Sequence, residues 1–234
     1  GSAKGKGLVR KTLVVAQFSI SIILLIATAI TFQQLDFLNS RTLGYDKDQV
    51  VVFGYYSDDL DKNYEAFYNE LTKTSVIENA TRSSRIPTGR LLDSSGPPLI
   101  TKGDSLINST VTTKVVAIDE EFFRTYGMEM AAGRNLSKEF VNDDSLSFIV
   151  NETAAKAYGW NNVSDGLDKD FMYASIKGKL VGIVKDFHFE SLHQPIIPIV
   201  FYSRPGIFSD LSIRISAGKT QEGLAHIEKV WKEF

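Results

Sequence analysis

The feature that most constrains this chain is a long uncharged stretch near its amino end. No charged residue lies between Thr12 and Leu35, and residues 13–32 read LVVAQFSISIILLIATAITF. About 20 apolar residues span roughly 30 Å as a helix, which matches the hydrocarbon core of a bilayer. The sequence therefore predicts a transmembrane helix over residues 12–35, preceded by a cytoplasmic flank or tag over residues 1–11.

The alternative is a cleaved signal peptide, which has a shorter apolar region and a cleavage site of small residues. Ala27-Thr28-Ala29 imitates such a site weakly, and the length of the stretch favours retention in the membrane. Several polar side chains interrupt the stretch, and we expect residues of this kind to face another transmembrane helix. They are Gln17, Ser19, Ser21, Thr28 and Thr31.

The distribution of charge orients the predicted helix. Lys4, Lys6, Arg10 and Lys11 precede the uncharged stretch, whereas all 28 acidic residues and the other 22 of the 26 basic residues follow it. By the positive-inside rule, the amino end lies in the cytoplasm and the remainder lies outside. We therefore expect a protein of the cell inner membrane whose soluble body is in the periplasm.

Composition excludes several functional classes. A length of 234 residues and 43% apolar residues suit one large domain or two modest ones with a packed core. A net charge of -2 provides no basic field for nucleic acid, so we expect no nucleic-acid partner. The absence of cysteine excludes disulfides, thiol catalysis and Cys-ligated metal sites.

The ends of the chain suggest a fragment. Gly1-Ser2 resembles a cloning scar, and the chain stops at Phe234 within a predicted helix. We therefore expect an excised piece of a longer protein.

The body reads as a mixture of helices and strands. The helical pattern continues to about Thr42 as a stalk, and a turn at Leu43-Gly44-Tyr45 leads to a strand at Val50–Val52. Further helices are predicted over 61–74, up to Tyr126 with Asp119 as the cap, over 152–158 with Asn151 as the cap, and over 220–234. Further strands are predicted over 75–84, in a hairpin around 102–105, and over 110–118, 147–150, 171–174, 179–185, 196–202 and 211–216. The fold class is therefore α+β.

Two clusters could carry chemistry, and both fall short of a motif. Asp186, His188, Glu190 and His193 are possible metal ligands or acid/base groups, but their spacing fits no zinc motif. Alternation places Phe187 and Phe189 on one face and the polar residues on the other, as in a half-buried strand.

The second cluster, Gly218-Lys219-Thr220, resembles the end of a phosphate-binding loop. Ile213 stands where the first glycine is needed. With His188, His193 and His226 as the only histidines, no Ser-His-Asp arrangement emerges. We expect no catalytic, cofactor-binding or metal-binding residues, no cofactor and no enzyme activity.

Four stretches and their order resemble the MacB/FtsX-type permease subunits of ABC transporters. They are Arg10–Phe18 with the apolar run that follows; Gln33–Leu38 with Leu43–Asp46; Phe122–Gly127 with Ala132–Arg134; and Val181–Leu192. Asn151-Glu-Thr-Ala154, at the start of a helix, is also similar. The resemblance covers nearly the whole chain as one transmembrane helix followed by a MacB-like periplasmic core domain.

This resemblance implies a body in two parts. One is a porter-like α/β subdomain from both chain ends, over residues 49–84 and 180–234, and the other is an inserted, mostly β subdomain over residues 85–179. Residues 36–48 form the stalk between membrane and body. Members of this family do no covalent chemistry, since a separate cytoplasmic ATPase drives them and the stalk helices pass its conformational change to the periplasmic domain.

The predicted function is therefore mechanotransmission by an ABC transporter permease that acts on a periplasmic substrate or protein. The partners expected are a cytoplasmic ATP-binding subunit, the other permease half or a second permease copy, membrane lipid, and an unknown periplasmic substrate or protein. The alternative is a periplasmic ligand-binding sensor domain of a membrane receptor or histidine kinase, which would return through a second membrane helix to a signalling module. An anchored periplasmic enzyme is the third hypothesis, and no nucleophile-base set supports it.

Overall fold

A computed structural model of the chain describes residues 2–40, 43–103, 105–140, 143, 146–192 and 194–234. The chain divides into two compact units, residues 1–42 and residues 43–234, and each is described by itself. The first unit is the helix α1 (Ser2–Ser40), and no proline interrupts it. The second unit, called the body below, contains all the other helices and strands of the described residues.

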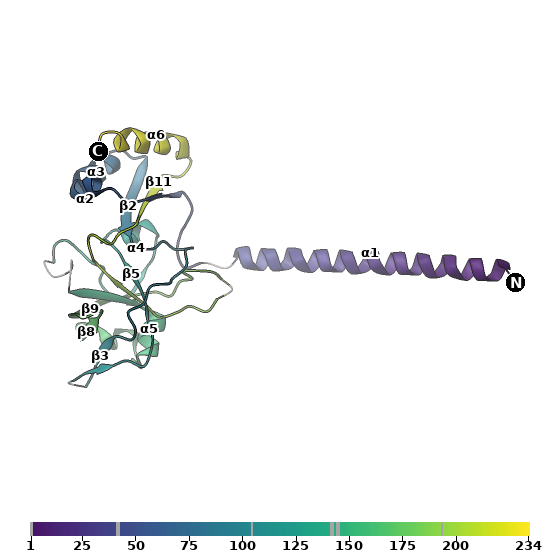
Figure 1. The fold of residues 1–234 in the computed structure, drawn as a ribbon, viewed down its shortest axis with the longest axis horizontal. Helices are drawn as coiled ribbons and strands as arrows, with labels where there is room; N and C mark the ends of the chain where they lie inside the picture. The colour runs from purple at the N-terminus through teal and green to yellow at the C-terminus, as the bar shows by residue number, and fades with distance from the viewer. Residues whose placement is uncertain (1, 41–42, 104, 141–142, 144–145, 193) are drawn as a thin grey trace. The chain divides into compact units, whose positions relative to one another are not determined.

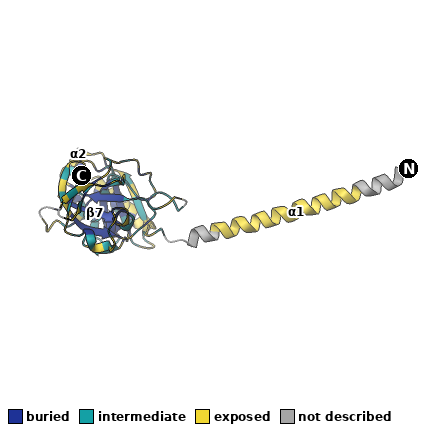
Figure 2. Ribbon diagram, turned by 90° about the horizontal axis from the view of Figure 1, so that it is seen from below, coloured by how far each residue is buried: buried dark blue, intermediate teal, exposed yellow. Residues whose placement is uncertain are grey.

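Helix α1 has the composition of a membrane span. By length and composition, residues Arg10–Leu35 qualify as a candidate span with a mean hydropathy of 2.5. Their side chains are exposed throughout, as the yellow part of α1 in Figure 2 shows. A soluble helix with an apolar surface all round would need a protein partner, so a bilayer is the environment that this surface fits.

Three hydroxyl groups of α1 form hydrogen bonds within the helix. Ser21, Thr28 and Thr31 each donate a hydrogen bond to the carbonyl oxygen one turn earlier, at Oγ to O distances of 2.8–2.9 Å. This back-bonding is a common way for hydroxyl side chains to sit in a helix without another partner. The expectation that these side chains face a second membrane helix therefore stays a prediction, because their hydrogen bonding does not require it.

The body is α+β, as the sequence predicts, and contains two sheets (Figure 1). The first sheet has three antiparallel strands in the order β1 (Val50–Gly54), β11 (Asp210–Ile215), β2 (Ile77–Ser83). Helices α2 (Asp58–Lys62), α3 (Tyr64–Thr72) and α6 (Thr220–Trp231) lie with this sheet at one end of the body. Their apolar stripe, which includes the fully buried Phe67 and Leu71, packs on Ala80 and Ile213 of the sheet.

The second sheet has eight strands in the order β4, β3, β8, β9, β7, β10, β5, with β6 paired to β9. Their bounds are β3 (Leu99–Lys102), β4 (Ser105–Asn108), β5 (Lys114–Ala117), β6 (Met130–Gly133), β7 (Ser147–Asn151), β8 (Asp170–Tyr173), β9 (Ile176–Val184) and β10 (Ile199–Tyr202). The pairs β7 with β9 and β5 with β10 are parallel, and the others are antiparallel. β7 is buried at every residue, as its dark blue colour in Figure 2 shows.

Both faces of this second sheet are covered. Helix α5 (Glu152–Ala157) and the short 3-10 helix η1 (Val163–Gly166) pack on one face, where Phe148 and Phe171 are buried. Helix α4 (Phe122–Thr125) packs on the other face, where Phe122 and Phe201 are buried. Strands covered on both faces have continuous apolar runs in their sequence, as Phe148-Ile149-Val150 of β7 does.

Helix α4 also contacts the first sheet, and this contact is polar. The buried Asn79 Nδ2 donates to Thr125 Oγ1 at 3.0 Å, and Tyr126 and Ser212 share a hydrogen bond of 2.7 Å between their hydroxyl oxygens. Thr81 Oγ1 donates to Asp119 Oδ1. The two sheets are therefore joined through α4 by directional hydrogen bonds, which fix their register more specifically than apolar packing would.

Most predicted elements are present, with differences at their ends. The helix predicted over 61–74 is split between α2 and α3, because Asn63 lies between them outside helical geometry. The Asn151 side chain caps α5 as predicted, since its Oδ1 accepts from Ala154 N at 3.1 Å. Strand β6 (Met130–Gly133) was not predicted. Of the hairpin predicted around 102–105, residue 104 lies outside the described residues.

The domain boundaries stay a prediction, because the chain divides into compact units only at 42/43. The pairing of two strands crosses the predicted boundary between the two parts. Strands β9 and β10, which fall mostly or wholly in the range 180–234 assigned to the porter-like part, pair with strands from the range 85–179. Among the described residues after 179, β11 is the strand that belongs to the three-stranded sheet.

Candidate functional site

The candidate site is the segment Leu43–Asp48, which follows α1 in the chain and which we call the junction. The backbone N–H of His188 donates to the carbonyl oxygen of Leu43 at 2.8 Å. The ring of Tyr45 meets the ring of Phe187 edge to face, with their centroids 6.2 Å apart. The junction is thereby attached to the chain that leaves β9 of the eight-stranded sheet.

Gly44 allows the junction to lie this close. Its φ is +82°, and a Cβ atom at this position would be 2.7 Å from the Cβ of Phe187 and 2.9 Å from the carbonyl oxygen of Asp186. Only glycine combines a left-handed conformation with so close an approach of two backbones. The turn predicted at Leu43-Gly44-Tyr45 is therefore a packing contact as well as a change of direction.

Arg214 attaches the same segment to the three-stranded sheet. From β11, its guanidinium group donates to the carbonyl oxygen of Asp46 at 2.6 Å and to the carboxylate of Asp46 at 2.8 Å. It also donates to the carbonyl oxygens of Asp48 at 3.3 Å and Thr125 at 2.6 Å. The backbone N–H of Asp46 donates to the carbonyl oxygen of Tyr126 at 2.8 Å. One side chain, 12% exposed, thus joins the junction, β11 and the end of α4.

The polar residues of the predicted 186–193 cluster do not converge. Asp186 accepts from the backbone N–H and the hydroxyl of Thr153, both at 2.8 Å, and lies 3.7 Å from Lys156 Nζ. It therefore stabilises the first turn of α5. Glu190 accepts a hydrogen bond from the backbone N–H of Leu91 at 2.6 Å. Leu91 is far from α5 in the chain. Each carboxylate has a structural partner of its own.

The histidines are placed differently from one another. His188 is half-buried, and its Nδ1 has no hydrogen-bond partner among the described residues. His193 lies outside the described residues. His226 Nε2 is 3.1 Å from the carbonyl oxygen of Leu71 and joins α6 to α3. Among the residues that the structure describes, no group of three or more His, Cys, Asp or Glu side chains is placed to hold a metal ion.

The alternation predicted for this segment is confirmed. Phe187 and Phe189 are buried, at 1% and 3% exposure, while Asp186, His188 and Glu190 between them are half-buried. The segment is irregular rather than a strand, because β9 ends at Val184. The aromatic pair anchors this loop to the core beneath the eight-stranded sheet.

The segment that resembles a phosphate-binding loop lies between β11 and α6. Gly218 has a φ of +76° with open space around it, and Ile213 is buried completely. The strand that precedes the turn belongs to an antiparallel three-stranded sheet. Phosphate-binding loops follow strands of a parallel, doubly wound sheet, so this turn lacks both the glycine and the setting that such a loop requires.

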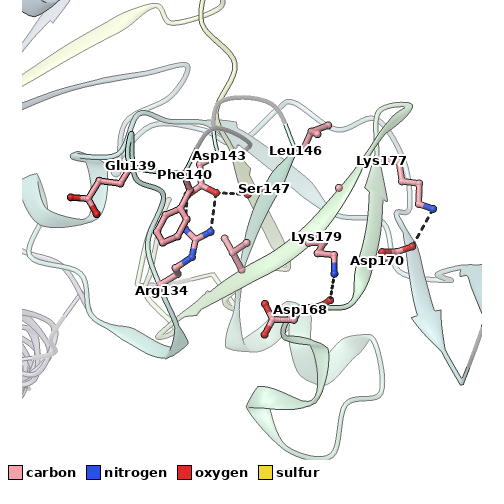
Figure 3. A pocket seen from close by; sticks show the side chains of 12 residues that line it. Arg134, Glu139, Phe140, Asp143, Leu146, Ser147, Asp168, Asp170, Lys177 and Lys179 are labelled. Atoms are coloured by element: carbon pink, nitrogen blue, oxygen red, sulfur yellow. Dashed lines mark hydrogen bonds and ion pairs between the residues drawn. The ribbon is translucent and has the colours of Figure 1, made fainter.

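A cavity of about 530 Å³ lies beside β9, lined by charged side chains (Figure 3). Arg134 Nη2 donates to Asp143 Oδ1 at 2.9 Å, and its guanidinium carbon lies 3.9 Å from the centre of the Phe140 ring. Lys177 pairs with Asp170 at 3.1 Å. Because these basic groups already have acidic partners, the cavity does not select a ligand of one charge.

Asp119 is the most strongly perturbed acid among the described residues. It is 4% exposed, and it accepts from the hydroxyl of Thr81 and from the backbone N–H groups of Arg82, at 2.7 Å, and Glu121, at 3.1 Å. Burial raises the pKa of Asp119 to about 7, against the lowering effect of the hydrogen bonds from Thr81 and Arg82; the nearby charge of Glu120 adds to the rise. This carboxyl group joins β2 to the segment before α4.

We expect Asp119 to make stability depend on pH. Its pKa in the folded chain, about 7, exceeds the value of about 3.9 in an unfolded chain, so between these values the folded state holds a proton that the unfolded state has lost. The free energy of unfolding should therefore fall as pH rises, by about 2 kcal/mol between pH 5 and pH 7. Urea denaturation at both pH values should show this decrease in the wild type and not in Asp119→Asn. An equal decrease in both proteins would contradict the assignment.

The sequence analysis did not identify Arg214 as the residue that binds the junction. The only signal was a charged residue within an otherwise alternating strand, LSIRI, where a cation is unusual in a buried sheet. Its partners are about 170 residues away in the chain, at Asp46 and Asp48, so no local pattern connects them. Asp119 was identified only as a helix cap.

The chain is similar to MacB-type permease proteins in part of its sequence and in its fold. The sequence is 28% identical over 118 residues to the macrolide export ATP-binding/permease protein MacB of Mannheimia succiniciproducens. The match covers 50% of this chain and spans 16% of the length of that protein. No family model matches the chain.

The fold is similar to that of solved domains. The periplasmic region of MacB from Actinobacillus actinomycetemcomitans matches with a TM-score of 0.52 and 16% identity, over 81% of this chain and 85% of that chain. The extracellular domain of the noncanonic ABC-type transporter YknZ matches with a TM-score of 0.46 and 11% identity, over 74% of this chain and 88% of that one, a score too low to establish a shared fold.

These similarities confirm the resemblance to MacB-type permeases that the sequence predicts. The relatives are components of transporters. Together with the apolar helix α1, the similarity to a MacB periplasmic region supports anchoring in the inner membrane with the body in the periplasm.

Proposed function

We propose that this chain is the extracytoplasmic domain of an ABC transporter permease subunit, with one membrane helix, and that it transmits an ATP-driven conformational change from the membrane to its periplasmic body. The observation that carries the proposal is the junction, because Leu43–Asp48 comes soon after the membrane helix in the chain and is attached to the chain that leaves β9 and to β11. The partners proposed are a cytoplasmic ATP-binding subunit, the other permease half or a second copy, and membrane lipid. The body is proposed to act on a periplasmic substrate or protein.

The contacts of the junction suit transmission. Gly44 leaves no space between the junction and the chain after β9, and Arg214 makes four hydrogen bonds, three to the junction and one to Thr125. A charge-assisted hydrogen bond is about twice as strong as a neutral one, so these contacts resist separation when the segment is displaced. A displacement of Asp46 would therefore move β11 and the end of α4 together.

The helix that would deliver such a displacement is continuous. Helix α1 extends from Ser2 to Ser40, and neither proline nor glycine occurs between Leu8 and Ser40. An α-helix of this kind transmits axial and rotational movement because each turn is hydrogen-bonded to the next. Glycine, by contrast, favours the unfolded backbone and interrupts such a helix.

A triple-glycine insertion after Asp36 is the test of this proposal. In the full-length permease, reconstituted in lipid with its ATP-binding subunit, the insertion should abolish the transport-coupled part of ATP hydrolysis and leave the basal rate. The same insertion after Gly206, an exposed turn of the body with open space around it, serves as the control and should leave coupling intact. Full coupling after the insertion at Asp36 would show that α1 does not transmit the change.

A further inference from the structure

Strand β1 forms a free edge of the three-stranded sheet. On its other side it pairs with β11, and just beyond this pair the backbone N–H of Tyr55 donates to the carbonyl oxygen of Ser209 at 2.8 Å. Because alternate residues of an antiparallel pair share hydrogen bonds, Phe53 also bonds to β11, whereas Val52 and Gly54 point their N–H and C=O groups outward. No hydrogen bond joins these outward groups to another described residue.

The edge of β1 lacks the protection that two other sheet edges of the body have. The outer edge of β2 is covered, because the backbone N–H of Arg82 donates to Asp119 Oδ2 at 2.7 Å. The outer edge of β5 is covered by the loop before β3, where Val115 N donates to the carbonyl oxygen of Asp93 at 3.1 Å. Strand β1, with the sequence VVVFG, has neither a charged residue nor a proline, which are the usual means of preventing an edge from pairing. This edge is therefore suited to pair with a further strand.

The topology of the sheet indicates where that strand comes from. Strands β1 and β2 are joined through α2 and α3, and they are parallel to each other with β11 between them. Strand β11 and helix α6 begin a second crossover, and α6 contacts α3 on the same face of the sheet (Figure 1). Crossovers between parallel strands are right-handed in about 98% of cases. Because β11 runs opposite to β1, a crossover of the same hand over the same face proceeds in the opposite direction, past β1 to its free edge.

Apolar side chains beside this edge are exposed and would be covered by such a strand. Leu224 and Trp231 are seven residues apart, which places them on one face of α6, and they are 43% and 37% exposed. The ring of Trp231 contacts that of Phe53 in β1, with centroids 5.6 Å apart. Val52, which points to the other face of the sheet, is 38% exposed. Apolar surface is therefore present on both faces of the sheet at the edge of β1.

We propose that the edge of β1 binds a fourth strand, antiparallel to β1 and supplied by the polypeptide that follows α6 in the full-length permease. The sheet then has the order strand-helix-strand-strand-helix-strand, a recurring motif with two interlocked crossovers. Helix α6, of 12 residues, supplies a crossover of the length that such a connection requires. The fourth strand would end beside Val50, next to the junction. The inference rests on the proposed function in one respect, that a permease subunit extends beyond α6.

Hydrogen–deuterium exchange in detergent micelles tests the proposal on two proteins. One is the chain of residues 1–234, and the other is the same chain extended by about the next 15 residues of the full-length permease, enough for a turn and a strand. The Val52 amide should exchange at least about tenfold more slowly in the extended chain, because it gains a hydrogen bond. The Phe53 amide, already bonded to β11, is the matched control and should exchange equally in both. Neither protein includes the ATP-binding subunit, so the outcome is independent of the coupling test above.

Val52→Pro distinguishes strand pairing from simple shielding of the edge. Proline lacks an N–H group and is tolerated in an edge strand where that group points outward, so the variant of chain 1–234 should melt within about 1 °C of the wild type. In the extended chain the same substitution should lower the melting temperature by about 2–4 °C, because the new pair of strands loses a hydrogen bond. Val51→Pro is the control, since the N–H of Val51 points to β11, and it should destabilise both proteins.

The proposal is overturned by either of two results. One is equal exchange of the Val52 amide in the two proteins, together with equal tolerance of Val52→Pro. The other is protection of the Val52 amide in the unextended chain that increases with protein concentration, which would make β1 of a second copy the strand that pairs with this edge.

Discussion

Phe187→Ala should lower the free energy of unfolding of the body by about 3–5 kcal/mol, the usual cost of truncating a buried phenylalanine. The side chain is 1% exposed and lies at the meeting point of several aromatic rings. Its ring contacts those of Tyr45, Phe189 and Phe201, with centroids 6.0–6.2 Å apart. The substitution leaves a cavity directly beneath the junction, so the loss includes contacts that no neighbour can replace.

His188→Ala is the matched control for Phe187→Ala. His188 is the next residue in the chain, and its Nδ1 is buried without a partner among the described residues, so truncation removes no side-chain hydrogen bond that the structure shows. We expect a change below about 1 kcal/mol. Urea denaturation of the full chain in detergent measures both. The opposite result would be that Phe187→Ala leaves stability unchanged, while His188→Ala folds but abolishes activity in the cell. This segment would then be a functional site instead of a structural anchor.

Gly133→Ala should cost about 2–4 kcal/mol, because two separate effects combine at this position. Gly133 has a φ of +72°, which an alanine adopts only with strain. A Cβ atom would also collide with the carbonyl oxygen of Val181, and it would be 2.7 Å from Leu167 Cδ2. The backbone of β9 cannot move away, because Arg134 N donates to the same carbonyl oxygen at 3.0 Å.

Gly218→Ala isolates the collision from the conformational strain. Gly218 has nearly the same φ, +76°, but no atom lies within 4 Å of the position of its Cβ. We expect this variant to lose only about 1 kcal/mol, the cost of the left-handed conformation. Thermal melting of the two variants side by side measures the difference. Equal losses would mean that β6 and β9 separate easily, contrary to their close pairing.

Local sequence patterns were sufficient to predict the membrane helix, most strands and the burial of the two aromatic side chains that anchor the loop after β9. The burial of Phe187 and Phe189 follows from alternation alone, because neighbouring side chains on extended backbone point to opposite sides. The cap at Asn151 follows from the residue type before a helix. Both signals are contained within a few residues, so one sequence is enough to read them.

Long-range pairing could not be predicted in the same way. Nothing near Ile199 or Val200 in the chain indicates that β10 pairs with both β5 and β7, since this depends on which partner is free after the sheet assembles. Strand β6 was missed because Met130–Gly133 is too short and too rich in small residues to show alternation. The junction depends on Arg214, whose partners lie at the opposite end of the body's sequence.

The place where the chain leaves the three-stranded sheet and the place where it returns lie side by side. Ser83, the last residue of β2, is the ladder partner of Asp210, the first residue of β11, and Ser209 N donates to Ser83 O at 2.9 Å. Directly paired residues of antiparallel strands lie only about 5 Å apart. The spacing of β2 and β11 at this point therefore does not depend on the length of the chain between them. Such a site of attachment would let evolution exchange the inserted part of the body while the three-stranded sheet keeps its own geometry.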